Sequence, residues 1–218
     1  MNHRNVLMPL TEKPVLRLDR HGWLHTAAGV TLAPSPNYDE RPLQQDAHLL
    51  VLHNISLPPG QFGGTHVIDF FLNRLDYRSH PWFEHIQGMR VSAHFFIRRD
   101  GRIVQFVSTE YRAWHAGVSQ FEGRERCNDF SIGIELEGTD HLPYEDAQYA
   151  ALQRLVPALK ARHPLRSAQG HEHIAPGRKT DPGPAFDWQR FGRENGFPRR
   201  CLPDGRQTIE RPAGPVRS

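Results

Sequence analysis

The sequence predicts an α/β fold, and three segments carry that prediction. Leu49–Leu52 is a short, continuous apolar run, which is typical of a strand buried on both faces. Phe130–Glu137 alternates apolar and polar residues and predicts a second central strand. Tyr144–Arg162 repeats leucine and valine at helical spacing, so it predicts a helix with one apolar face, which Pro157 should kink or break.

Other segments complete this pattern. Gly64–Leu72 is expected to form a helix, and a short helix is expected around Asp187–Phe191. Val91–Ile97 predicts a strand, and the Asp100–Gly101 pair is a strong signal for a hairpin turn into Arg102–Val107.

Composition limits the class of protein. With 218 residues, 38% hydrophobic and 10% aromatic, the chain can build a core and is not disordered. The net charge of +3 is small and scattered, which makes nucleic-acid binding a weak hypothesis, and a basic pocket for a small acidic substrate fits as well. Because the sequence has no membrane span and no signal-type apolar run, we expect a cytoplasmic protein with no membrane partner. We also expect a monomer. Cys127 and Cys201 lack metal-knuckle or redox spacing and are expected to be free thiols.

Three parts of the chain differ in composition. Residues 1–16 are predicted to be an N-terminal extension, and residues 17–195 to be a single domain. Residues 196–218 are rich in proline, glycine and arginine and are predicted to be a flexible C-terminal tail.

The stretch Gly170–Pro182 is unusually dense in reactive groups. It holds two imidazoles, two carboxylates, a lysine and an arginine, in backbone interrupted by glycine and proline. Such backbone should form neither a regular helix nor a long strand, and irregular loops often carry function. The alternative is an ordinary polar loop in a chain with 14 histidines.

A metal site can be assembled from this stretch and the end of the first central strand. His53, His171 and Asp181 are two imidazoles and a carboxylate, a set that suits catalytic zinc with its three protein ligands. Spacing alone does not choose between His171 and His173. A strand end is where α/β folds place their chemistry, although His53 would also fit a plain strand cap.

Two charged residues suit hydrolysis beside such a site. Glu135 lies near the end of the second central strand and is a plausible general base for an attacking water. Lys179 could stabilise a developing oxyanion. The alternatives are a surface carboxylate and a solvated lysine.

Longer phrases of the chain resemble a known family. They resemble the cytosolic 1,6-anhydro-N-acetylmuramyl-L-alanine amidases (AmpD-type), within the zinc amidase and peptidoglycan-recognition superfamily. The resemblance extends from about residue 16 to residue 191, with the phrases in the family's order. The matching phrases are Trp23–Leu24, Pro34–Asp39, Val51–Gly60, Arg90–Phe95, Ala113–Gly117, Gly123–Gly138 and Gly170–Pro184.

The resemblance implies a role for each matched position. It implies that His53, His171 and Asp181 are the zinc ligands, Glu135 the catalytic carboxylate and Lys179 the polarising cation. It also implies a muropeptide cleft, where arginines suit the carboxylates of a stem peptide. The implied cleft residues are Asn54, Arg90, Trp114 and Arg126.

Three further histidines are not ligands in the family. The resemblance implies packing or pocket-lining roles for His94 and His115, and it leaves His173 outside the ligand set. The implied fold is a single domain with a central mixed β-sheet flanked by helices, of the N-acetylmuramoyl-L-alanine amidase type 2 or peptidoglycan-recognition kind. The site would lie at one end of the sheet.

The resemblance implies zinc-dependent cleavage of the amide between 1,6-anhydro-N-acetylmuramic acid and L-alanine of the stem peptide. It places this reaction in cytoplasmic peptidoglycan recycling, which is linked to β-lactamase induction. Two alternatives stay open. One is a periplasmic amidase acting on intact murein, and the other is a non-catalytic peptidoglycan-binding module. Loss of a ligand would favour the binding module, but all five residues of the implied site are present.

Overall fold

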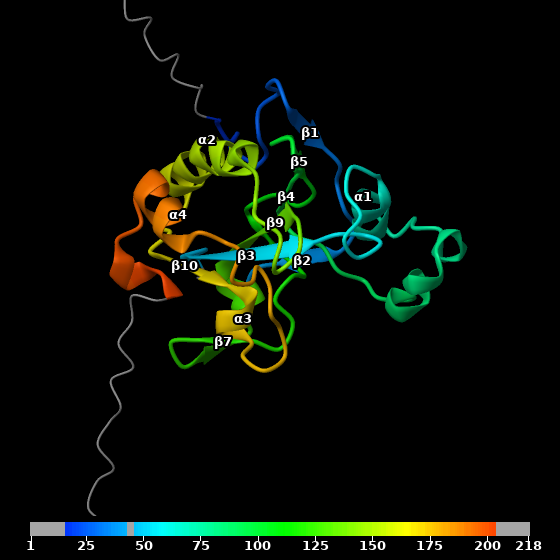
Figure 1. Ribbon diagram of the computed structural model, residues 1–218. Helices are drawn as coiled ribbons and strands as arrows, with labels where there is room; N and C mark the ends of the chain where they lie inside the picture. The colour runs from blue at the N-terminus through cyan, green and yellow to red at the C-terminus, as the bar shows by residue number, and fades with distance from the viewer. Residues whose placement is uncertain (1–15, 43–45, 204–218) are drawn as a thin grey trace, which may run out of the picture.

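A six-stranded sheet forms the centre of the protein. The computed structural model describes residues 16–42 and 46–203 (Figure 1). The order of the strands in the sheet is β1-β5-β4-β9-β3-β10. All neighbours are parallel except β4 and β5, so the predicted mixed sheet is confirmed. Its strands are β1 (Val30–Leu32), β3 (Leu49–Ile55), β4 (Phe95–Ile97), β5 (Ile103–Gln105), β9 (Ser131–Glu137) and β10 (Ser167–Gly170).

Two small two-stranded sheets accompany it. They are β2 (Tyr38–Glu40) with β6 (Tyr111–Ala113), and β7 (Gln120–Phe121) with β8 (Arg124–Glu125). The α-helices are α1 (His66–Phe71), α2 (Asp146–Arg162), α3 (His171–Ile174) and α4 (Trp188–Asn195). The 3₁₀ helices are η1 (Tyr77–Ser79), η2 (Pro81–Ile86), η3 (Cys127–Phe130) and η4 (Arg199–Cys201).

The helices divide between the two faces of the sheet. α2 and α4 contact each other and cover one face, while α3 lies on the opposite side of β3 (Figure 1). α1 shares a second apolar cluster with Phe96 of β4 and Val104 of β5. The described part of the chain contains no helix that is long and apolar enough to cross a membrane.

β3 and β9 are adjacent, parallel and almost wholly buried. Their register pairs Leu52 with Ile134 and His53 with Glu135. Since successive side chains in a strand point to opposite faces, each pair occupies one face. Leu52 and Ile134 belong to the core cluster beneath α2. His53 and Glu135 therefore lie together on the other face.

α2 confirms the predicted helix but not the predicted break. It begins after Glu145, whose amide donates to Gln148 Oε1 at 3.0 Å, while the Gln148 amide donates to the Glu145 carbonyl at 2.9 Å. Pro157 lies inside a helix that continues to Arg162. Proline removes one helical hydrogen bond, but the neighbouring Val156 is fully buried in the core. Tertiary packing thus outweighs the local cost.

The predicted strand at Val91–Ile97 is shorter in the structure, where only β4 is paired. The preceding residues bond loop residues as well as β9, where the His94 amide donates to the Gly133 carbonyl at 3.1 Å. Asn37 donates from Nδ2 to the Val91 carbonyl at 2.8 Å, and Ser92 donates from Oγ to the Asn37 carbonyl at 2.6 Å. The sequence interpretation also missed β1 and β10, which are short and lack an apolar run.

The ends of the predicted domain need correction. Residues 196–203 were assigned to a flexible tail, but Phe197 and Leu202 are buried in the core beside α4. Gly192 makes this packing possible, because a Cβ there would lie 2.5 Å from Leu202 Cδ1. Leu16, assigned to the N-terminal extension, is also a core residue. The remainder of both predicted termini, residues 1–15 and 204–218, lies outside the described residues.

Candidate active site

Three ligand-type atoms converge where β3 meets the loop after β10. His53 Nδ1 lies 3.0 Å from His171 Nδ1 and 3.1 Å from Asp181 Oδ2, and His171 Nδ1 lies 3.2 Å from the same oxygen. Ligands about 2.0–2.1 Å from a tetrahedral zinc ion would be about 3.3 Å apart. The spacing of these atoms therefore fits such an ion.

The loop brings its two relevant residues to β3 by an abrupt change of direction. β10 pairs with β3 as far as Gly170, and the single turn α3 begins at His171. This one turn is the only helix in a stretch that is otherwise irregular, largely as expected. His173 points elsewhere, since its Nδ1 accepts from the Gly170 amide at 3.2 Å. The geometry thus selects His171, which spacing could not do.

Hydrogen bonds and burial prepare these side chains for a cation. His171 Nε2 lies 3.0 Å from the Ala116 carbonyl and must donate to it, which leaves Nδ1 with a lone pair. Burial, followed by the nearby His171, lowers the pKa of His53 to about 4, so its imidazole is neutral at pH 7. Burial opposes ionisation of Asp181, but the two imidazoles beside its carboxylate, His171 and His53, bring its pKa far below the usual range.

Glu135 lies beside these atoms on the neighbouring strand. Burial, followed by the charge of Asp181, raises the pKa of Glu135 well above its ordinary value, while Lys179 opposes the rise. Within the described residues its buried Oε2 has no hydrogen-bond partner. A buried carboxylate with a spare oxygen can take a proton from a bound molecule.

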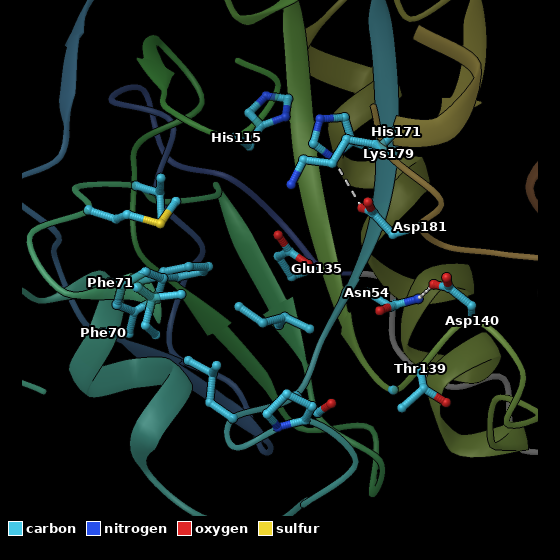
Figure 2. A pocket seen from close by; sticks show the side chains of 18 of the residues that line it. Asn54, Phe70, Phe71, His115, Glu135, Thr139, Asp140, His171, Lys179 and Asp181 are labelled. Atoms are coloured by element: carbon cyan, nitrogen blue, oxygen red, sulfur yellow. Dashed lines mark hydrogen bonds and ion pairs between the residues drawn. The ribbon is translucent and has the colours of Figure 1, made fainter. Parts of the chain in front are cut away.

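A cavity of about 480 Å³ opens over this group. Figure 2 shows Glu135, Lys179, His171 and Asp181 directed into it, with Phe70 and Phe71 on the wall formed by α1. Sequence interpretation missed much of its wall. The missed residues include Phe70, Phe71, Trp82, Met89, Thr139 and Asp140. Met89, for example, is an apolar residue that is 47% exposed, and the sequence alone does not predict this exposure.

Two of the four predicted substrate residues line this cavity. Trp114 does so while its indole Nε1 donates to Asp39 Oδ1 at 2.7 Å, which fixes the ring. Asn54 donates from Nδ2 to Asp140 at 2.7 Å and to the Pro182 carbonyl at 3.2 Å. Because these bonds use both amide hydrogens, Asn54 supports the loop next to Asp181 and can offer a substrate only its oxygen.

The two arginines are not in the cavity. Arg90 is exposed between two residues that line it, Met89 and Val91. Arg126 lies in a left-handed backbone conformation and faces a second hollow, which also contains Arg178. Its Nε lies 3.4 Å from Asp129. The resemblance implies that Arg126 lies at the peptide end of the cleft, away from the metal, and in the structure Arg126 lines this second hollow and not the cavity over the donor triangle.

Comparisons with known proteins agree with this geometry. Residues 43–184 match the family model described as N-acetylmuramoyl-L-alanine amidase. The chain belongs to this family. The amidase is 58% identical over 172 residues to the 1,6-anhydro-N-acetylmuramyl-L-alanine amidase AmpD of Citrobacter freundii, covering 78% of this chain and 90% of that one. The same protein of Escherichia coli K12 is also 58% identical, covering 78% and 92%.

Solved structures extend the comparison to the fold. The crystal structure of a selenomethionine derivative of AmpD superposes on the amidase with a TM-score of 0.77 at 56% identity, covering 81% of this chain and 98% of that chain. The amidase LysC of Clostridium intestinale gives 0.56 at 15% identity, covering 78% and 98%, and supports the fold alone. The predicted family and fold class are thus confirmed.

Proposed function

We propose that the amidase cleaves the amide between the lactyl group of 1,6-anhydro-N-acetylmuramic acid and L-alanine, with zinc held by His53, His171 and Asp181. The single observation that carries this proposal is the triangle of donor atoms, 3.0–3.2 Å apart, next to a buried glutamate. The 58% identity to two enzymes with that named activity supports the choice of substrate.

The fit of zinc can be judged from the side chains themselves. Two imidazole nitrogens and one carboxylate oxygen are donors that zinc accepts, and their separations suit a tetrahedral shell. When bound, zinc would supply Lewis-acid chemistry, lowering the pKa of a water and polarising an amide carbonyl. Because Asp181 is ionised and both imidazoles can present a lone pair, the three side chains would not need to rearrange.

Glu135 and Lys179 supply the remaining chemistry. Glu135 takes a proton from the attacking water while the oxygen of that water bonds to the carbonyl carbon. It then delivers that proton to the alanine nitrogen as the carbon–nitrogen bond breaks. The raised pKa of Glu135 suits it to hold the proton between these steps. The Lys179 ammonium, which lines the same cavity, stabilises the oxyanion that forms on the carbonyl.

Substrate class follows from the cavity and the relatives together. The walls combine apolar groups such as Phe70 and Trp82 with the polar Asp140 and Asn54, which suits a sugar carrying a lactyl-peptide arm. We propose that the amidase acts as a monomer on soluble muropeptides of cytoplasmic recycling, with a consequent influence on β-lactamase induction. A non-catalytic module is disfavoured because Glu135 and Lys179 accompany the donor triangle.

One experiment tests both metal and substrate. Purified protein is analysed for metals and then assayed on anhydro-muropeptide, on the same muropeptide with a reducing muramic acid, and on intact sacculi. We expect one zinc per chain, loss of activity with a chelator, recovery with zinc, and fastest cleavage of the anhydro form. Active protein without a transition metal would refute the zinc assignment. Faster cleavage of sacculi would instead support the periplasmic alternative.

A further inference from the structure

Two consecutive residues contact the outer nitrogens of both histidines in the donor triangle. His53 Nε2 lies 2.9 Å from His115 Nδ1, and His171 Nε2 lies 3.0 Å from the Ala116 carbonyl. All four residues are buried. Figure 2 shows His115 beside His171 at the same end of the cavity. The segment His115–Ala116 therefore braces the triangle from behind.

The direction of the hydrogen bonds can be worked out from their partners. If His53 presents its Nδ1 lone pair to a cation, its Nε2 carries the hydrogen and donates it to His115 Nδ1. His115 Nε2 must then carry a hydrogen, and Ser131 Oγ lies 3.2 Å away to accept it. The His53 and His115 rings meet edge-on at 86°, which suits such an in-plane bond.

The backbone of this segment is fixed from outside the site. Asn128 Oδ1 accepts from the His115 amide at 3.2 Å and from the Ala116 amide at 2.8 Å. On the sheet side, the His115 ring lies directly over Gly133 of β9, where a Cβ would be 2.5 Å from His115 Cγ. Only glycine leaves room for the ring in this position.

We propose that His115 is a positioning residue, which fixes the tautomer of His53 by accepting its Nε2 hydrogen and so presents His53 Nδ1 to the metal. This inference rests on the proposed ligand set of His53, His171 and Asp181. An acceptor behind a ligating imidazole also makes the ligand nitrogen more basic. His115 thereby acts on the reaction through His53, without touching the substrate's reacting atoms.

The wild-type protein gives the first test and needs no substitution. In zinc-loaded protein labelled with ¹⁵N, His115 should carry its hydrogen on Nε2 and not on Nδ1. A scalar coupling across the hydrogen bond should connect His53 Nε2 with His115 Nδ1. A hydrogen on His115 Nδ1 would overturn the proposal, because that nitrogen could no longer accept.

Substitutions give the second test, with zinc affinity measured by competition with a chelator. His115→Phe keeps a ring but removes the acceptor, and it should weaken zinc binding roughly 10–100-fold. His115→Asn places an amide oxygen near the lost Nδ1 and should recover part of that affinity. The control is His163→Phe, a half-buried histidine bonded to a hydroxyl, Thr109, which should bind zinc as tightly as wild type.

Gly133→Ala removes no polar group from the protein but should displace the His115 ring. It should weaken zinc binding in the same direction as His115→Phe, and a zinc affinity equal to wild type in both variants would refute the role of His115. If the wild-type protein itself holds no zinc, the ligand assignment fails instead. The two outcomes are therefore distinguishable.

Discussion

The two faces of the central sheet differ more than any other two regions of the molecule. Ile134 and Glu135 are neighbours in β9, yet Ile134 lies in the apolar cluster under α2 and Glu135 lies over the cavity. On β3 the same alternation separates Leu52 from His53. All four are buried, at 8% exposure or less.

Burial therefore has opposite consequences on the two faces. Burying apolar side chains stabilises the fold by about 1.5–3 kcal/mol each. Burying carboxylates and imidazoles costs stability unless they are paired, and Glu135 Oε2 has no partner in the described chain. The α2 face of these two strands is apolar, while the other face keeps reactive groups, at a cost in stability, beside apolar clusters of its own. Substitutions should separate these roles.

The largest effect should come from Glu135→Gln on the reactive face. Because glutamine cannot carry the proton, kcat should fall roughly 10²–10⁴-fold. Zinc content should not change, and the free energy of unfolding in urea should stay level or rise. Glu137→Gln is the matched control, since Glu137 lies two residues further on the same face and bonds the Gly63 and Arg99 amides. Full activity of Glu135→Gln would move proton transfer to another group.

On the opposite face, Ile134→Ala should act on stability alone. Removing a fully buried side chain from a packed core costs about 2–5 kcal/mol. Urea unfolding should register this loss, while kcat and KM of the folded enzyme at low temperature stay near wild type. A fall in kcat with unchanged stability would contradict the separation of the two faces.

A smaller loss should mark the edge of the apolar face. Leu202→Ala should lower the free energy of unfolding by about 2 kcal/mol, because Leu202 packs on Gly192 at the margin of the core. Arg200→Ala, two residues earlier and exposed, is the control and should change little. Equal stability of the two variants would restore the flexible tail predicted from composition.

The smallest effect concerns pH and a polar group outside both faces. Burial lowers the pKa of His163 to about 4, from an ordinary 6.5. Below pH 6.5 the unfolded chain therefore binds a proton that the folded chain refuses until about pH 4, so stability falls as the pH falls through this window. His163→Phe should reduce the loss between pH 7 and pH 5 by about 1 kcal/mol, allowing for screening at its exposed edge. Parallel pH profiles for the two proteins would contradict this.

The sequence predicts features that depend on neighbouring residues better than features that depend on contacts between residues far apart in the chain. The apolar run Leu49–Leu52 by itself predicts a buried strand. The segments around His53 and Glu135 resemble the family's motifs closely enough to identify the candidate site. Both His171 and His173 fit the ligand pattern by spacing, and only the turn after β10 aims one of them at His53.

The failures have the same physical origin. Leu202 was assigned to a tail because proline and arginine surround it, yet a glycine in α4 provides the space that buries it. Arg126 was placed in the cleft by the family resemblance, but sequence similarity does not reveal which hollow the residue after the β7–β8 hairpin lines. His115 has no local signal for its bond to His53, since 62 residues separate the two.

The pairing of His53 with Glu135 across two parallel strands has a consequence for how the site can evolve. Neighbouring strands are held about 4.8 Å apart by their backbone hydrogen bonds, whatever side chains they carry. Ligand and base thus inherit their separation from the ladder, whereas Trp82 in η2 and Met89 and Thr139 in loops lie outside it. Residues of the cavity wall can therefore be substituted without changing the separation of His53 and Glu135. To change the muropeptide preference, the segments that carry Trp82, Met89 and Thr139 should therefore be replaced while β3 and β9 are kept.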